Sequence, residues 1–134
     1  MIYKNFIKQE KGSCCFVYAV INCLIYLKKE IKNKEKAFDI AGCKNGSTIY
    51  HQKVIDFLNC PIKLTSNEQT VFKKGGIINI MHPIYNGHSV FIFPEKEGLT
   101  LVNSWLGPNI MKNIGINEIK PLISYKCGNF YYIL

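Results

Sequence analysis

Residues 14–27 read CCFVYAVINCLIYL, a run of fourteen residues without a charge. Ser13 precedes this run as a candidate N-cap, and neither Gly nor Pro interrupts residues 13–30. Lys28 and Lys29 follow it, where the dipole of a helix favours cations. The pattern predicts a helix over residues 13–30 that is apolar on almost every side. Such a helix belongs at the centre of a fold, with most of its surface buried.

The same run raises the question of a membrane or export segment. It is too short to span a bilayer, which takes ~20 apolar residues. Lys4, Lys8 and Lys11 precede it, as in a signal peptide. However, Asn22 interrupts the run, and KKEIKNKEK follows without a cleavage site of small residues. We therefore interpret the run as a buried helix and expect no membrane association.

Pro61 divides the rest of the chain into a part with a predicted helix and a part with predicted strands. Residues 31–46 are polar and lead into a Gly-containing loop, and Ser47 opens a second predicted helix that reaches about Asn59. After Pro61, short β-type runs alternate with turn residues, and one helical turn is expected at 117–120. Helices first and strands second predict one α+β domain over residues 1–134, with the helices on one side of an antiparallel sheet. The expected strands are 70–72, 76–81, 88–93, 99–103 and 129–134, with a turn at 94–98.

Composition narrows the class of partner. The chain has 134 residues, of which 48% are hydrophobic, so a disordered chain is excluded. Its net charge is +8, and all of its basic residues are Lys. Nucleic-acid recognition relies on the bidentate contacts of Arg, so nucleic acid is not the favoured partner. A bias in amino-acid composition, together with the need for solubility, explains the excess of Lys. The alternative explanation is that the positive charge attracts an acidic partner.

Six cysteines lie at positions 14, 15, 23, 43, 60 and 127. This density is below that of a disulfide scaffold, and adjacent cysteines rarely bridge each other. No CxxC pair exists, and the three histidines have no metal-ligand spacing with the cysteines. We expect six free thiols, no metal and a reducing, cytoplasmic compartment.

Two cysteines stand where a thiol can become reactive. Cys14 and Cys15 lie at the predicted start of the central helix, where unpaired N–H groups and the dipole lower a thiol pKa. A catalytic thiolate also needs a base or an imidazolium partner. Without one, a cysteine in this place is a small core residue.

His88 is the best-placed histidine, since it starts an apolar strand directly after Gly87. His51 is expected on the exposed part of the second helix, and His82 in a loop. Asn103 follows His88 by fifteen residues, and a hairpin of that separation brings the two side by side on adjacent strands.

With Gln9 six residues before Cys15, the chain resembles the papain-like cysteine peptidases. In that superfamily a loop Gln precedes the catalytic Cys by six residues, and an aromatic residue, here Phe16, follows the Cys. The family's His lies on a strand, and Asn-Ser-Trp, here residues 103–105, closes the next strand. Residues 42–47, GCKNGS, are similar to the loop that runs along the substrate backbone, so Asn45 and Gly46 are candidate substrate-binding residues.

The chain also departs from that family. It is much shorter, Phe16 replaces the usual Trp, and Gly12 stands where those enzymes have a disulfide cysteine. The compact layout is similar to the bacteriocin-processing peptidase domains of peptide exporters, which usually have Asp in the third place. Asn103 with Trp105 favours the papain type, and there is no transporter segment in the sequence.

The resemblance implies a hydrolase of the thiol protease type that cleaves a peptide or isopeptide bond without a cofactor. It makes Cys15 the nucleophile and His88 the proton donor. Asn103 orients the imidazole, Gln9 binds the oxyanion, and Trp105 shields the His–Asn bond.

The partner would be a peptide or protein substrate. This substrate would be acidic if the excess of Lys contributes to its binding. Cys15 is preferred to Cys14 by its spacing from Gln9, and Cys14 is expected to be buried and inert. Two alternatives stay open: a papain-like acyltransferase or catalytically idle binding module, and a basic adaptor without enzymatic activity.

Overall fold

A computed structural model describes residues 5–9, 14–43, 48, 50–81, 87–103, 110–124 and 131–134. Within these ranges the chain forms an α+β fold with a six-stranded sheet, which confirms the predicted class. The helices are α1 (Cys15–Tyr26), α2 (Lys34–Ala41), α3 (His51–Leu58), α4 (Glu68–Lys74), α5 (Ile116–Ile119) and the 3-10 turn η2 (Lys120–Leu122). The strands are β1 (Lys63–Thr65), β2 (Gly76–Ile80), β3 (His88–Glu95), β4 (Gly98–Val102), β5 (Ile110–Ile114) and β6 (Tyr131–Ile133).

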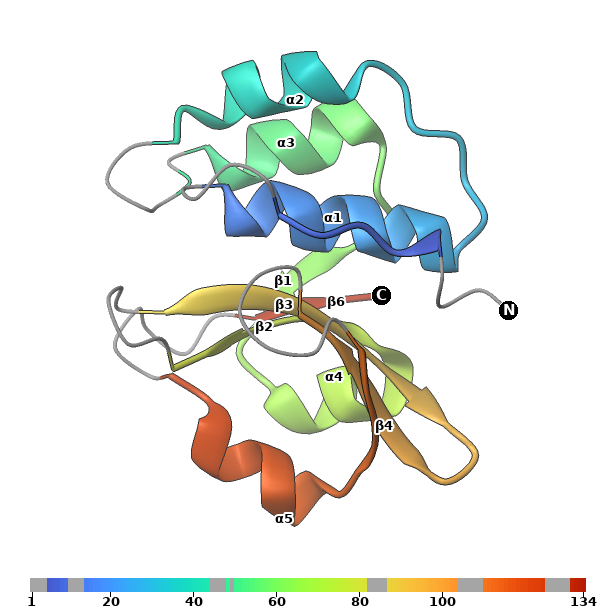
Figure 1. The fold of residues 1–134 in the computed structure, drawn as a ribbon. Helices are drawn as coiled ribbons and strands as arrows, with labels where there is room; N and C mark the ends of the chain where they lie inside the picture. Colours follow the sequence, from blue (N-terminus) through green and yellow to red (C-terminus); the bar gives the residue numbers. More distant parts are fainter. Residues whose placement is uncertain are drawn as a thin grey trace.

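The sheet is antiparallel throughout and has the strand order β1-β6-β2-β3-β4-β5. Helices α1, α2 and α3 lie over one face, and α4 and α5 lie under the other (Figure 1). The expectation of helices on one side only is therefore wrong. The reason is that both faces of the central strands β2, β3 and β4 are apolar and need cover.

Helix α1 is the centre of the upper layer, as the sequence predicts. Ten of its twelve residues are buried, and it packs against β3. It ends at Tyr26 because Lys28 takes a left-handed conformation with φ 58°, so the two lysines lie beyond the helix. Within the described ranges, no helix has the length and apolar character needed to cross a membrane.

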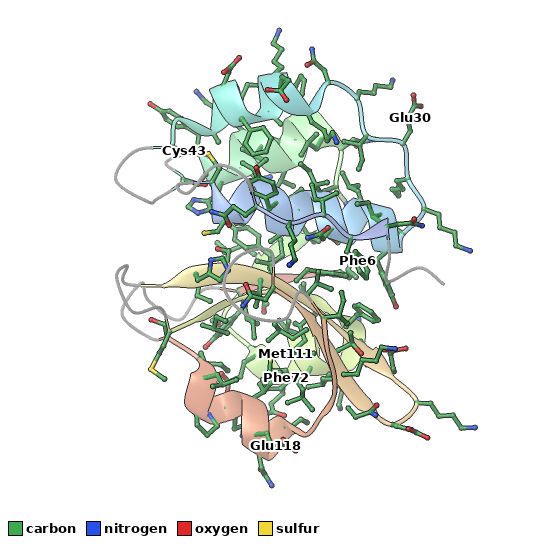
Figure 2. The ribbon with its side chains drawn as sticks, viewed as in Figure 1. Phe6, Glu30, Cys43, Phe72, Met111 and Glu118 are labelled. Carbon is green, nitrogen blue, oxygen red and sulfur yellow. A yellow bond between two sulfur atoms is a disulfide. The ribbon has the colours of Figure 1, made fainter. Side chains whose placement is uncertain are left out.

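Two hydrophobic clusters stabilise the molecule, one on each face of the sheet. The upper cluster joins α1, α2 and α3 to alternate strand residues such as Ile77 and Phe91. The lower cluster joins α4 and α5 to the residues between them, such as Ile78 and Val90. Figure 2 shows Phe6 of the upper cluster and Phe72 of the lower cluster on opposite sides of the sheet.

Two segments differ from the predicted elements. Residues 34–41, expected as a polar connection, form α2, which the Asn33 side chain caps at the Lys36 N–H (3.2 Å) and which Gly42 ends with φ 61°. Residues 70–72, expected as a strand, lie in α4, where the Asn67 side chain accepts the Gln69 N–H (3.1 Å). In the first segment, caps at both ends make a helix of a polar stretch, and in the second, the cap outweighs a short apolar pattern.

The remaining elements follow the predicted ones closely. Helix α3 lies within the predicted second helix, and β2, β3, β4 and β6 match four of the five expected strands. Helix α5 overlaps the expected turn at 117–120, whereas β1 and β5 were not expected. Glu95 pairs with Gly98 at the end of the β3–β4 hairpin, which places a two-residue connection inside the predicted turn.

Candidate active site

Cys15 is the first residue of α1, at the end of the helix that faces the start of β3. Its side chain is 9% exposed, and its Sγ accepts a hydrogen bond from the Ser89 N–H at 3.4 Å. That N–H belongs to the peptide that joins His88 to Ser89. Because consecutive Cα atoms are only about 3.8 Å apart, this bond places the His88 backbone beside Cys15.

The environment of Cys15 contains opposing influences on its ionisation. Burial raises the pKa of the Cys15 thiol, and this is the largest effect. The hydrogen bond from the Ser89 N–H, the backbone N–H groups of Cys15 and Phe16, and the nearby Ser89 hydroxyl act against it, but the pKa remains raised. The N–H groups at the helix start therefore lower this pKa, as expected, but burial outweighs them. A reactive thiolate at Cys15 requires a cationic partner.

His88 and Asn103 form the second part of the site. The His88 ring is 3% exposed, and its Nε2 lies 2.8 Å from Asn103 Oδ1. His88 opens β3, and Asn103 directly follows β4, which pairs antiparallel with β3. The hairpin thus brings the two residues together as the sequence predicts. An amide oxygen is an acceptor, so Nε2 carries the proton in this bond and proton exchange with a thiol falls to Nδ1.

Gln9 lies in the segment that runs along α1. Two residues earlier, a pair of hydrogen bonds ties this segment to α1: the Ile7 N–H donates to Asn22 Oδ1 (2.9 Å), and Asn22 Nδ2 donates to the Ile7 carbonyl (3.3 Å). Asn22 is fully buried in α1, so its amide would be unsatisfied without Ile7. The sequence showed Asn22 only as an interruption of an apolar run.

A disulfide joins Cys14 to Cys43, with the two Cα atoms 5.8 Å apart. The expectation of free thiols is wrong for these two residues, and Cys14 is inert because it is bonded rather than because it is only buried. Figure 2 shows Cys43 at the end of the molecule where α1 begins. Cys15, Cys23 and Cys60 are free thiols, as expected, and Cys127 lies outside the described residues.

His51 differs from its expected place. It is half-buried at the start of α3, with its ring edge-on to Phe16 at 4.4 Å, and burial lowers its pKa. It lines a hollow of about 30 Å³ beside Cys15. The other lining residues are Phe16, Ile77, Asn79, Ser89 and Tyr132. This volume accommodates about one water molecule.

Several candidate residues lie outside the described ranges. They are the proposed substrate-binding residues Asn45 and Gly46, the shielding residue Trp105, and also Gly12 and His82. Among the residues that the structure does describe, no group of three His, Cys, Asp or Glu side chains is arranged to hold a metal ion.

The described site therefore combines a buried thiol at a helix start with an oriented imidazole on the neighbouring strand. This combination suits nucleophilic attack on a carbonyl carbon followed by proton transfer to a leaving group. Sequence reasoning missed Ser89 and Asn79, whose only signal was polarity at positions of β-strands that face a buried layer. No family model matches the chain, and neither does any curated protein or solved structure.

Proposed function

We propose that this protein is a thiol hydrolase that cleaves a peptide or isopeptide bond through an acyl-enzyme on Cys15. The observation that carries the proposal is the hydrogen bond of 2.8 Å between His88 Nε2 and Asn103 Oδ1, made one residue from the peptide N–H that contacts Cys15 Sγ. Orienting a histidine by an amide is useful where the ring must present its other nitrogen to a reacting group.

In the acylation step, the Cys15 thiolate attacks the carbonyl carbon of the substrate. A C–S bond forms, and the π electrons of the carbonyl move to its oxygen. As the tetrahedral intermediate collapses, the C–N bond breaks, and the His88 imidazolium gives its proton to the departing amine. The products of this step are a thioester on Cys15, a free amine and a neutral imidazole.

In the deacylation step, His88 takes a proton from water as the water oxygen attacks the thioester. The C–S bond breaks, a carboxylic acid leaves, and the thiolate–imidazolium pair is restored. The Gln9 amide and the Cys15 N–H are the proposed donors to the oxyanion in both steps. One such donor typically lowers the barrier by ~2.7–4 kcal/mol.

We also propose that the chain has a papain-like fold. Four features support this: Gln9 lies before the central helix, Cys15 opens it, His88 opens β3, and Asn103 follows β4. The proposed partner is a peptide or protein, acidic where the net charge of +8 contributes to binding. The Cys14–Cys43 disulfide weighs against the proposed cytoplasmic location, because disulfides seldom persist in that compartment.

Alkylation with limiting iodoacetamide tests the nucleophile without knowledge of the substrate. Cys60 is a matched internal control, because it is a free thiol of similar exposure, 6% against 9% for Cys15. We expect peptide mapping to find Cys15 labelled at least ten-fold faster than Cys60 near pH 6. His88→Ala should abolish this advantage by removing the cationic partner.

Turnover is then measured on a mixed library of peptidyl aminomethylcoumarin amides and on an isopeptide-linked peptide. Hydrolysis that is lost in Cys15→Ala and kept in Cys60→Ala supports the hydrolase. A thioester that accumulates and transfers to added amines instead supports the acyltransferase. Equal labelling of Cys15 and Cys60 in the unchanged protein would overturn both.

A further inference from the structure

A second polar pair lies beside Cys15, separate from His88 and Asn103. Asn79 of β2 is directly opposite Ser89 of β3 in the sheet register, and the Ser89 hydroxyl donates to Asn79 Oδ1 at 2.9 Å. Ser89 is 7% exposed. The function proposed above uses neither side chain.

The alternation of the strands directs this pair toward α1. Ile77, Phe91 and Phe93 belong to the cluster that contains α1, whereas Ile78 and Val90 belong to the cluster on the other face. Asn79 and Ser89 occupy the same alternate positions as the first set. The Ser89 N–H contacts the Cys15 sulfur, and the Ser89 hydroxyl on the same residue is near enough to lower the pKa of the Cys15 thiol.

A serine hydroxyl has one hydrogen and rotates to suit its strongest acceptor. While Cys15 is a neutral thiol, the amide oxygen of Asn79 is the better acceptor, which is the arrangement observed. A thiolate carries a full charge, and hydrogen bonds to charged groups are roughly twice as strong as neutral ones. The hydroxyl therefore has two acceptors whose order reverses when the thiol ionises.

We infer that Ser89 is a further catalytic residue, which moves its hydroxyl hydrogen from Asn79 to the Cys15 sulfur when the thiolate forms, and that Asn79 is its positioning residue. The inference rests on the proposed role of Cys15 as nucleophile. No bond between heavy atoms changes in this step. The Ser89 proton stays on its oxygen, and the thiol proton goes to His88.

Among the residues that the structure describes, the other titratable groups around Cys15 do not replace this donor. They are His88 on β3, His51 on α3 and Tyr132 on β6. Burial lowers the pKa of His51, and burial raises that of Tyr132, so both are neutral near pH 7. The charged side chains of α2 are exposed on its outer side, and β2 has none.

The test is the rate of Cys15 alkylation by iodoacetamide from pH 5 to pH 9, measured on the full chain. We expect Ser89→Ala to slow the reaction about ten-fold near pH 6 and to approach the unchanged protein at high pH, because it removes one charge-assisted bond. Ser89→Thr keeps the hydroxyl and should restore the pH profile. Ser124→Ala is the control, since Ser124 is an equally buried serine whose N–H bonds to the Asn79 carbonyl.

The outcomes separate the two proposals. If Cys15 of the unchanged protein reacts no faster than Cys60, the proposed function fails. If Cys15 reacts fast and Ser89→Ala keeps its rate and pH profile, only the role of Ser89 is overturned. Should Ser89→Ala not fold, Ser89→Gly provides the test, because it also removes the hydroxyl and adds no charge beside Cys15. Slower alkylation of that variant near pH 6 supports the inference, and an unchanged rate overturns it.

Discussion

Replacing Asn22 by leucine removes the two hydrogen bonds that hold the N-terminal segment against α1. The Ile7 N–H and carbonyl, bonded at 2.9 and 3.3 Å in the protein, then lose their partner. Leucine has a similar volume and a better helix propensity, so packing is largely kept. A partly buried backbone N–H and carbonyl left without partners cost about 2 kcal/mol together. For 134 residues this corresponds to a Tm lower by about 7 °C, measured by calorimetry.

Asn22→Asp distinguishes the hydrogen bonds from packing. A protonated aspartate accepts from the Ile7 N–H and donates its O–H to the Ile7 carbonyl, so it reproduces both bonds. Asn22 is fully buried, and burial raises the pKa of a carboxyl in the folded state above the unfolded value of ~3.9. The stability of this variant is therefore greatest below that unfolded pKa and is lost as the pH rises through the folded pKa.

The free energy of unfolding is measured with urea at pH 4 and pH 7 for both variants. We expect Asn22→Leu to be destabilised equally at the two pH values, and Asn22→Asp to be close to the unchanged protein at pH 4 only. Leucine without any loss of stability, or an aspartate deficit that is the same at both pH values, would refute the reasoning. If Gln9 is the oxyanion donor, Asn22→Leu also lowers kcat, because the bonds to Ile7 hold the segment that carries Gln9.

Three further predictions concern the disulfide, the triad and the sheet. Reduction of the Cys14–Cys43 bridge, which closes a loop of sequence separation 29, should lower the free energy of unfolding in urea by ~3–4 kcal/mol; an intact mass with six alkylated thiols before reduction would contradict the bridge. Gln9→Ala and Asn103→Ala should each lower kcat on a peptide amide about 100-fold with Tm nearly unchanged, whereas a joint loss of Tm would make either residue structural. Gly76→Ala should destabilise the protein by ~3 kcal/mol or more in the same urea assay, because its Cβ would collide with a carbonyl oxygen of β6; equal stability would show that β2 and β6 separate easily.

Local sequence signals were sufficient for the parts of the site that depend on one element or one hairpin. The apolar run at residues 14–27 required a buried helix, and α1 is that helix. The turn at 94–98 fixed the pairing of β3 with β4, and this pairing alone brings His88 to Asn103. A hairpin needs no information from distant parts of the chain, which is why its contacts were predictable.

Pairings between distant segments could not be read in this way. Asn79 and Ser89 are adjacent only because β2 pairs with β3 across a connection outside the described ranges, and the Ile7–Asn22 pair depends on how the N-terminal segment crosses α1. The helix that covers the lower face of the sheet, α4, could not be predicted from the sequence either. Residues 70–72 are apolar enough for a strand, and only the Asn67 cap and the lysines at the end of α4 indicate a helix.

The choice between the two adjacent cysteines brings these levels together. Neighbouring residues on a helix point about 100° apart, so only one of Cys14 and Cys15 can face β3. The apolar run is too uniform to set this rotation, and the spacing from Gln9 chose Cys15 by resemblance alone. In the structure, the disulfide to Cys43 directs Cys14 toward the loop after α2, whereas Cys15 is contacted by Ser89 of β3. The bridge thus also keeps the second thiol from competing with Cys15. In Cys43→Ser the Cys14 thiol is released beside Cys15, and any alkylation of Cys14 that then appears measures how much of the selectivity the bridge provides.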